Sequence, residues 1–326
     1  MSSVHPNFDE DDRKYLDNVV LVIGVPCYGG NMLYSFSRSL SQLEKHLTAQ
    51  KIKYELCFIV QESLISRARN NIANHFLKRK DATHLLFLDA DIAFNPNSVV
   101  RLLLARTPLC GCVYPKKNLP IENVVQLLLE EVDIEKGNTD AIRAKYLLDT
   151  NNPNESEESK LTKRAAGVSL KSRALRYCVE TFSEMYLKPA TSQHDIAFAE
   201  VKSLGTGFMM IERQVFEKIR EAYPEHSYET LIQTEPRMME TRYDYFRVGV
   251  QDKDYLSEDW YFCRLARLQG FKSYACLLSS LRHTGAQSFF GCFGESIVGP
   301  EAYKLLSPNA DFPLVSIYAP REEFFF

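Results

Sequence analysis

The sequence lacks any apolar stretch that approaches the ~18 residues needed to cross a lipid bilayer. Residues 1–17, MSSVHPNFDEDDRKYLD, are polar and acidic, unlike a signal or transit peptide. A basic excess is also missing, because the formal net charge is -3. A nucleic-acid binder usually carries such an excess. We therefore expect a cytoplasmic protein with no transmembrane segment and no nucleic-acid partner.

Cysteines are present, but no CxxC pair occurs that would suggest a zinc site. The 8 cysteines are scattered, and several lie in apolar runs typical of strands. This pattern favours reduced, mostly buried thiols.

Hydrophobic residues make up 45% of the 326-residue chain, which is enough to build a sizeable core. Apolar runs typical of buried strands alternate with stretches that have helical periodicity. The predicted strands are 19–26, 54–60, 84–89 and 108–115, and the predicted helices are 31–49, 64–79 and one capped by Asn95 with Pro96 at its first position. This alternation predicts an α/β fold with a mainly parallel sheet flanked by helices.

The character of the chain changes at about 118–199, which is charged and helical in periodicity and which we interpret as an insertion. The core pattern resumes at 200–211 and continues with a helix at about 212–222. A polar, aromatic stretch at 224–256 is interpreted as a loop. A helix with Ser257 as N-cap and Gly270 after its end then follows. We predict one domain over 1–326, with a nucleotide-binding half at about 19–117 and an acceptor half at about 200–326.

Ligands of such sheets bind outside the carboxyl ends of the strands, and two aspartates follow the 84–88 run. Asp89 and Asp91 are two residues apart, so their carboxylates can converge just beyond the sheet. Adjacent carboxylates repel unless a cation lies between them, and hard divalent ions prefer oxygen ligands. The alternative is that one aspartate caps a turn and the other is solvated.

Other candidates each have a structural alternative. His283 is either a metal ligand or a packed histidine. Glu258 and Asp259 either complement the dipole of their helix or include a general base. Gly205, Thr206 and Gly207 allow a ligand to approach the backbone or form a strand entry. Further candidates for diphosphate and base contacts, or for solvated surface positions, are Arg67, Arg69, Lys116, Lys117 and Tyr28.

Several motifs occur in one order: PCYGG, SLISRARNN, LLFLDADIAF, GCVYPKK, GTGFMMI, YLSEDWYFC and LRHTGAQSF. Together they resemble the GT-A glycosyltransferases of bacteria and large DNA viruses, over about 19–117 and 200–290. The resemblance implies a GT-A (Rossmann-like) fold, a UDP- or GDP-sugar donor, and Mn²⁺ or Mg²⁺ as cofactor. It also implies a carbohydrate or glycoconjugate acceptor.

The resemblance further implies roles for individual residues. Asp89, Asp91 and His283 match metal ligands, and Asp259, or else Glu258, matches the base of inverting members. Pro26, Tyr28, Arg69 and Ala90 match the nucleotide site, and Gly205–Gly207 match the acceptor side.

We expect a metal-dependent glycosyltransferase. The rival enzyme class is a sugar-1-phosphate nucleotidyltransferase, which has a basic, glycine-rich loop after the first strand. VPCYGGN lacks a basic residue there. A glycan-binding module that has lost activity is the other alternative.

Overall fold

The computed structural model describes residues 8–120, 122–123, 172–184, 186–188, 198–232, 238–293 and 296. Two compact units divide the chain, the first over Met1–Cys112 and Val179–Cys276, and the second over Val113–Cys178 and Leu277–Phe326. Most of the predicted insertion at 118–199 and of the tail after 290 lies outside the described residues. No described helix is long and apolar enough to span a membrane.

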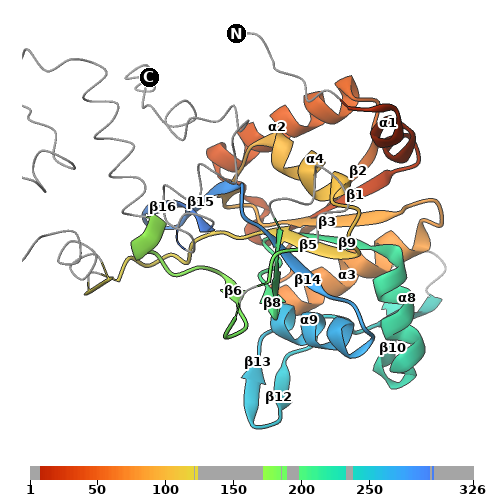
Figure 1. The fold of residues 1–326 in the computed structure, drawn as a ribbon. Coiled ribbons are helices and arrows are strands. Elements are labelled where there is room, and N and C mark those ends of the chain that lie inside the picture. The colour runs from red at the N-terminus through yellow and green to blue at the C-terminus, as the bar shows by residue number, and fades with distance from the viewer. Residues whose placement is uncertain are drawn as a thin grey trace, which may run out of the picture. The chain divides into compact units, whose positions relative to one another are not determined.

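A seven-stranded sheet forms the centre of the first unit, in the order β2-β1-β3-β9-β5-β14-β7 (Figure 1). Its strands are β1 (Val20–Cys27), β2 (Lys53–Val60), β3 (His84–Leu88), β5 (Leu109–Cys112), β7 (Phe198–Val201), β9 (Phe208–Glu212) and β14 (Ser273–Cys276). β1 pairs in parallel with β2 and β3, and β14 pairs in parallel with β5. β9 runs antiparallel to β3 and β5, and β7 runs antiparallel to β14. All strands except β9 and β7 therefore share one direction, which confirms the predicted mixed, mainly parallel sheet.

Helices cover both faces of this sheet (Figure 1). One face carries α1 (Glu10–Asp17), α2 (Tyr34–Ala49) and α4 (Pro96–Leu104), and the other carries α3 (Ile65–Lys78), α8 (Arg213–Ala222) and α9 (Glu258–Leu268). Short elements of the first unit are η1 (Tyr28–Gly30), β4 (Ile92–Ala93), β6 (Val179–Glu180), β8 (Ser203–Leu204) and η3 (Pro224–His226). In the second unit, β15 (Ser280–Thr284) and β16 (Ser288–Cys292) form an antiparallel pair.

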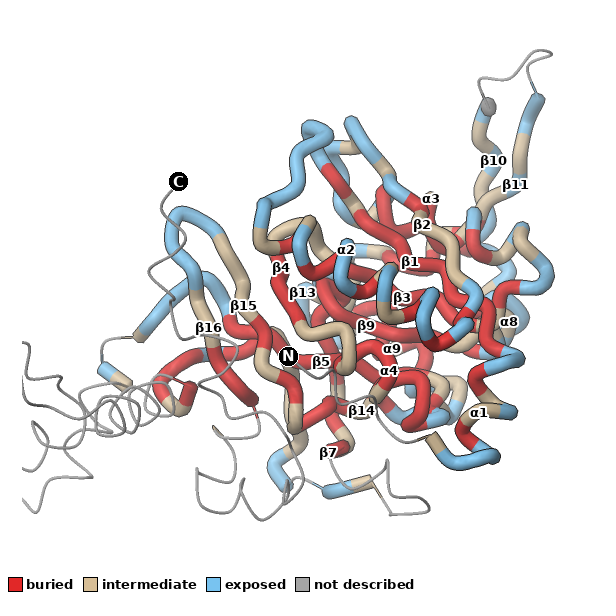
Figure 2. The backbone as a smooth tube through the Cα atoms, turned by 90° about the horizontal axis from the view of Figure 1, so that it is seen from above, coloured by how far each residue is buried: buried red, intermediate tan, exposed pale blue. Residues whose placement is uncertain are grey.

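The core lies along β1 and β3, where the continuous apolar runs of the sequence are buried (Figure 2). Beneath β3, four aromatic rings join the sheet to α8 and α9. Phe246 stacks on Phe262 at 4.6 Å between ring centroids and meets Phe87 edge-on at 5.1 Å. Phe216 contacts Phe262 at 5.4 Å. All eight cysteines are thiols and all except the half-buried Cys178 are buried, as expected.

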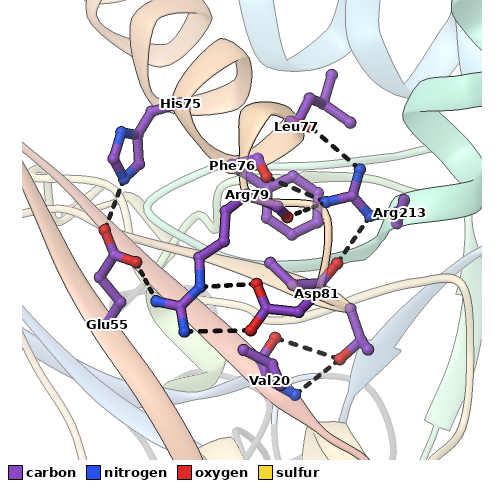
Figure 3. A network of polar contacts seen from close by, with 10 residues as sticks. Val20, Glu55, His75, Phe76, Leu77, Arg79, Asp81 and Arg213 are labelled. Carbon is purple, nitrogen blue, oxygen red and sulfur yellow. Dashed lines mark hydrogen bonds and ion pairs between the residues drawn. The ribbon is translucent and has the colours of Figure 1, made fainter.

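Arg213, the first residue of α8, closes the C-terminal end of α3 (Figure 3). Its guanidinium donates hydrogen bonds to the carbonyl oxygens of Phe76, Leu77, Arg79 and Ala82, at 2.6–3.4 Å. The last carbonyls of a helix have no partner within the helix, and a cation there is favourable. Arg213 therefore ties α8 to α3.

The helix caps follow the sequence prediction in part. Asn95 accepts a hydrogen bond from the backbone N–H of Asn97 at 2.9 Å, and Pro96 opens α4, as predicted. Gly270 follows α9 with φ of 84°, a left-handed conformation that favours glycine. Ser257 occupies the N-cap position, but its hydroxyl donates to the carboxylate of Asp259 instead of accepting from a backbone N–H.

The interpretation of 224–256 as a loop is wrong. This stretch forms two hairpins, β10 (Ser227–Ile232) with β11 (Met238–Tyr243), and β12 (Gly249–Gln251) with β13 (Asp254–Leu256). The residues of β10 and β11 are mostly exposed or half-buried (Figure 2), and so are those of β12 and β13, so the strands have none of the apolar runs that identified the core strands. The turn of the second hairpin uses Asp252 and Lys253, both at positive φ, and not the Asn-Gly or Asp-Gly pair that signals such turns.

Candidate functional site

The candidate site lies in the first unit, at the carboxyl ends of β1 and β3. These neighbouring parallel strands deliver η1 and the segment 89–91 to one edge of the sheet. The backbone N–H of Leu33 donates to the carbonyl of Ala90 at 3.1 Å, which joins the two loops. Gly29 and Gly30 have φ of 74° and 71°, so the turn that carries Tyr28 depends on glycine.

A cleft of ≈ 290 Å³ opens at this edge. It is lined by Pro26, Cys27, Tyr28, Asn31, Met32, Leu33, Ile65, Arg69, Asp89, Ala90 and Asp91. Six of these were candidates from the sequence: Pro26, Tyr28, Arg69, Asp89, Ala90 and Asp91. The other five were missed as individual residues, although three of them, Cys27, Asn31 and Ile65, lie in the segments 26–31 and 61–69 at the carboxyl ends of β1 and β2.

Arg69 connects the cleft to the start of α9. Its Nη2 donates to Oδ1 of Asp89 at 3.0 Å, and its Nε donates to Oε1 of Glu258 at 3.2 Å. The Arg69 side chain is only 4% exposed, and its guanidinium lies 5.6 Å from the centre of the Phe87 ring. This buried cation therefore holds two carboxylates that come from opposite halves of the sequence.

Asp259 differs from its neighbour Glu258. Burial and the nearby charge of Glu258 raise the pKa of Asp259 to about 6, against the hydrogen bond from Ser257 and the charge of Arg69, which lower it. Glu258 is instead ion-paired with Arg69. A general base works best when its pKa lies near the operating pH, so Asp259 is the better suited of the pair to accept a proton.

The donor set fits a hard divalent cation. Asp89 and Asp91 both line the cleft, and Arg69 pairs with Asp89 and Glu258 and also acts on the nearby Asp259. Among the described residues, no three His, Cys, Asp or Glu side chains gather into a metal site. A bound ion would therefore use the oxygens of Asp89 and Asp91 together with substrate phosphates and water, as magnesium commonly does.

Gly205, Thr206 and Gly207 are buried beside this edge, just before β9. The carbonyl of Gly207 accepts a hydrogen bond from the backbone N–H of Asp89 at 3.0 Å. The three residues do not line the cleft itself, but this bond fixes them next to Asp89.

Arg67 does not join the cleft. It is exposed and forms an ion pair with Glu62 at 2.5 Å. Although Arg67 is only two residues before Arg69, its guanidinium is therefore paired with a surface carboxylate instead of the cleft.

His283, Lys116 and Lys117 belong to the second unit. Nδ1 of His283 lies 2.8 Å from the carbonyl oxygen of Pro115, and its ring meets Tyr114 edge-on at 5.1 Å. Lys116 and Lys117 are exposed.

No family model and no curated protein matches the sequence. Among solved structures, the chain is similar to the crystal structure of A197 from STIV, with 15% sequence identity and a TM-score of 0.38 over 82% of this chain and 86% of that one. A TM-score this low does not define a common fold.

Proposed function

We propose that this protein is a metal-dependent glycosyltransferase with a GT-A fold. It would move a sugar from a nucleoside-diphosphate sugar, with uridine or guanosine as the nucleoside, to a hydroxyl of a carbohydrate or glycoconjugate. The observation that carries the proposal is the cleft at the ends of β1 and β3, where Asp89 and Asp91 lie next to Arg69 and, through it, next to Glu258 and Asp259.

The donor side of the cleft has the groups that a nucleotide needs. Tyr28 is 71% exposed at the rim and offers an aromatic face for the base. Asp89 and Asp91 would hold a divalent ion against the diphosphate, and the ion, when bound, neutralises charge on the leaving group. Pro26 and Ala90 shape the wall between these groups.

The acceptor side is served by the start of α9. Asp259 takes the proton from the attacking hydroxyl, the oxygen forms a bond to the anomeric carbon, and the bond from that carbon to the diphosphate oxygen breaks. Configuration at the anomeric carbon is inverted. Burial, and then the negative charge of Glu258 held by Arg69, keep the pKa of Asp259 high.

A sugar-1-phosphate nucleotidyltransferase is the main rival. Such an enzyme needs cations in the loop after the first strand, and the segment 27–31 in this chain, CYGGN, contains neither lysine nor arginine. An inactive glycan-binding module would have no use for a carboxyl group whose pKa is raised toward neutrality. The glycosyltransferase proposal accounts for both features.

Calorimetric titration of UDP and GDP, each with and without Mn²⁺, tests this proposal. We expect one of them to bind tightly only when Mn²⁺ is present, and Asp91→Asn to remove that dependence. Asp252→Asn is the matched control, because Asp252 is an exposed aspartate in the β12–β13 turn. Binding that is indifferent to Mn²⁺ in the wild type, or equal in both variants, would contradict the proposal.

A further inference from the structure

A second cavity of the first unit, of ≈ 380 Å³, lies at the other end of α3 from the cleft. Its walls come from the last two turns of α3, the end of α8, and the base of the β10–β11 hairpin, which begins close to α8 (Figure 1). The volume falls in the range of small-molecule pockets. None of its lining residues takes part in the proposed transfer.

Two asparagines on α3 fix the wall of this cavity. Asn74 accepts from the backbone N–H of Tyr243 at 3.0 Å and donates to the Tyr243 carbonyl at 2.9 Å. Asn70, one turn earlier, accepts from the backbone N–H groups of Tyr245 and Phe246 at 2.9 and 2.8 Å. The segment 243–246 is therefore held in place by the helix, so the cavity is bounded by fixed backbone.

Most charged groups of the cavity are already paired. Glu240 forms ion pairs with both Lys78 and Arg242, and Arg242 also donates to the side chain of Asn71 at 2.6 Å. Arg220, near the end of α8, is exposed and has no ion-pair partner among the described residues. Three cations against the one carboxylate of Glu240 leave the lining with an excess of positive charge.

Tyr245 contributes a polar group that the fold does not use. Its side chain is 0% exposed, with the ring packed edge-on against Phe216 at 5.0 Å, yet its hydroxyl has no hydrogen-bond partner within the described structure. Burial raises the pKa of this hydroxyl, so it remains a proton donor. The nearby charge of Arg220 lowers the same pKa, but by less. Buried hydroxyl groups are normally paired, because an unpaired one destabilises the fold.

We infer that this cavity is a binding site for a small organic anion, whose carboxylate or phosphate oxygens accept from the Tyr245 hydroxyl and pair with Arg220. Such an anion supplies the acceptor that Tyr245 lacks and neutralises part of the excess positive charge. Leu77 and Tyr243 also line the cavity, and their carbon atoms can pack against an uncharged body beside the anionic group. The inference is independent of the proposed transfer reaction.

Amide-resolved NMR titrations of the full chain with inorganic phosphate and with acetate test this inference. We expect saturable shifts at Ser227, Thr241 and Tyr245 with at least one of the two anions, and the more effective anion identifies the chemistry of the ligand. Shifts confined to Tyr28 and Ala90 in the cleft, or no saturable shift with either anion, would overturn it.

Three variants sharpen the test. Arg220→Met and Tyr245→Phe should each weaken the binding about tenfold or more, as expected for loss of a hydrogen bond to a charged group. Lys218→Met removes the same charge from the same helix but lies outside the cavity, so it should bind like the wild type. An equal loss of anion affinity in Lys218→Met would mean that the anion responds only to the overall charge of the protein. This result would overturn the proposal.

The melting temperature of Tyr245→Phe gives an independent readout. Because the hydroxyl has no partner to lose in the anion-free protein, the melting temperature should be unchanged or higher. A fall of several degrees would mean that the hydroxyl serves the fold itself, which would also overturn the inference.

Discussion

The Nε atom of Arg69 lies 3.2 Å from Oε1 of Glu258, although 189 residues separate the two in the chain. The same guanidinium reaches Asp89, so the pair joins the strand that ends at the cleft to the helix that carries Asp259. In the proposed reaction, this contact sets the position of Asp89 and Asp91, on the side of the sugar donor, relative to the catalytic base Asp259.

Replacing Arg69 with methionine should lower both stability and activity. The change leaves Asp89 and the mostly buried Glu258 without their cation, and breaking a buried ion pair costs on the order of 3 kcal/mol. Urea denaturation measures the loss. Arg67→Met on the same helix is the control, because its solvent-exposed pair with Glu62 should contribute little to stability. Equal unfolding free energies in the two variants would contradict the structural role of Arg69.

The pH dependence of transfer should follow Asp259. A base with a pKa of about 6 gives a kcat/KM that rises through pH 6 and is flat above it. Glu258→Gln removes the charge that raises this pKa and leaves Arg69 to lower it, so the rise should move to lower pH. Ser257→Ala removes a hydrogen bond that lowers the pKa, so the rise should move to higher pH. A profile that neither variant displaces would exclude Asp259 as the base.

The unfolding free energy should also depend on the protonation of Asp259, but this contribution should fall as the pH rises. The folded pKa of Asp259, about 6, is above its ordinary value of 3.8, so the folded protein binds more protons between these values. The contribution of Asp259 to the unfolding free energy is therefore largest below pH 3.8 and falls as the pH rises to 6. Asp259→Asn, compared with the wild type by denaturation at pH 4.5 and pH 7, should gain relative stability at the higher pH. An unchanged difference would contradict the raised pKa.

Tyr28→Ala should weaken nucleotide binding about tenfold, because an exposed ring at the rim of the cleft is lost as a stacking surface. Tyr34→Ala is a close control, since Tyr34 is 72% exposed nearby in the sequence but does not line the cleft. Calorimetry with the nucleoside diphosphate distinguishes the two. The same loss of nucleotide affinity in both variants would mean that the nucleobase binds elsewhere.

Arg213→Met should destabilise the protein by roughly 2 kcal/mol or more, because carbonyl oxygens at the end of α3 lose their donor. Arg213→Lys keeps the charge, but a lysine ammonium lacks the planar set of donors with which the guanidinium reaches all the carbonyls. This variant should therefore recover only part of the lost stability. Thermal and urea unfolding measure both. A variant as stable as the wild type would show that water replaces the guanidinium without cost.

The strands and helices that could be predicted from sequence are those with strong apolar patterns. The apolar runs at β1 and β3 are buried on both faces of the sheet, and they do not alternate with polar residues. The β10–β11 and β12–β13 hairpins were missed because strands exposed to solvent carry no such pattern. Helix α1 was missed for the same reason, since only Asp12 and Leu16 of it are buried.

The site residues could likewise be predicted only in part. Asp89, Asp91 and Arg69 were candidates because the ends of parallel strands lie at one edge, a rule that needs no knowledge of side-chain contacts. The pairing of Arg69 with Glu258, and the different environments of Glu258 and Asp259, depend on how α9 packs beneath the sheet. The Tyr245 cavity depends on the hairpin that the sequence did not reveal.

The long separation between Arg69 and Glu258 has a consequence for the order of folding. Asp89 and Arg69 are 20 residues apart, so their contact closes a short loop, whereas the contact with Glu258 closes one of 189 residues. The entropy lost on closing a loop grows with its length, so distant contacts tend to form late. The edge with Asp89 can thus take shape while the ribosome is still adding the later strands, and the carboxylate of Glu258 reaches it only after α9 has been made.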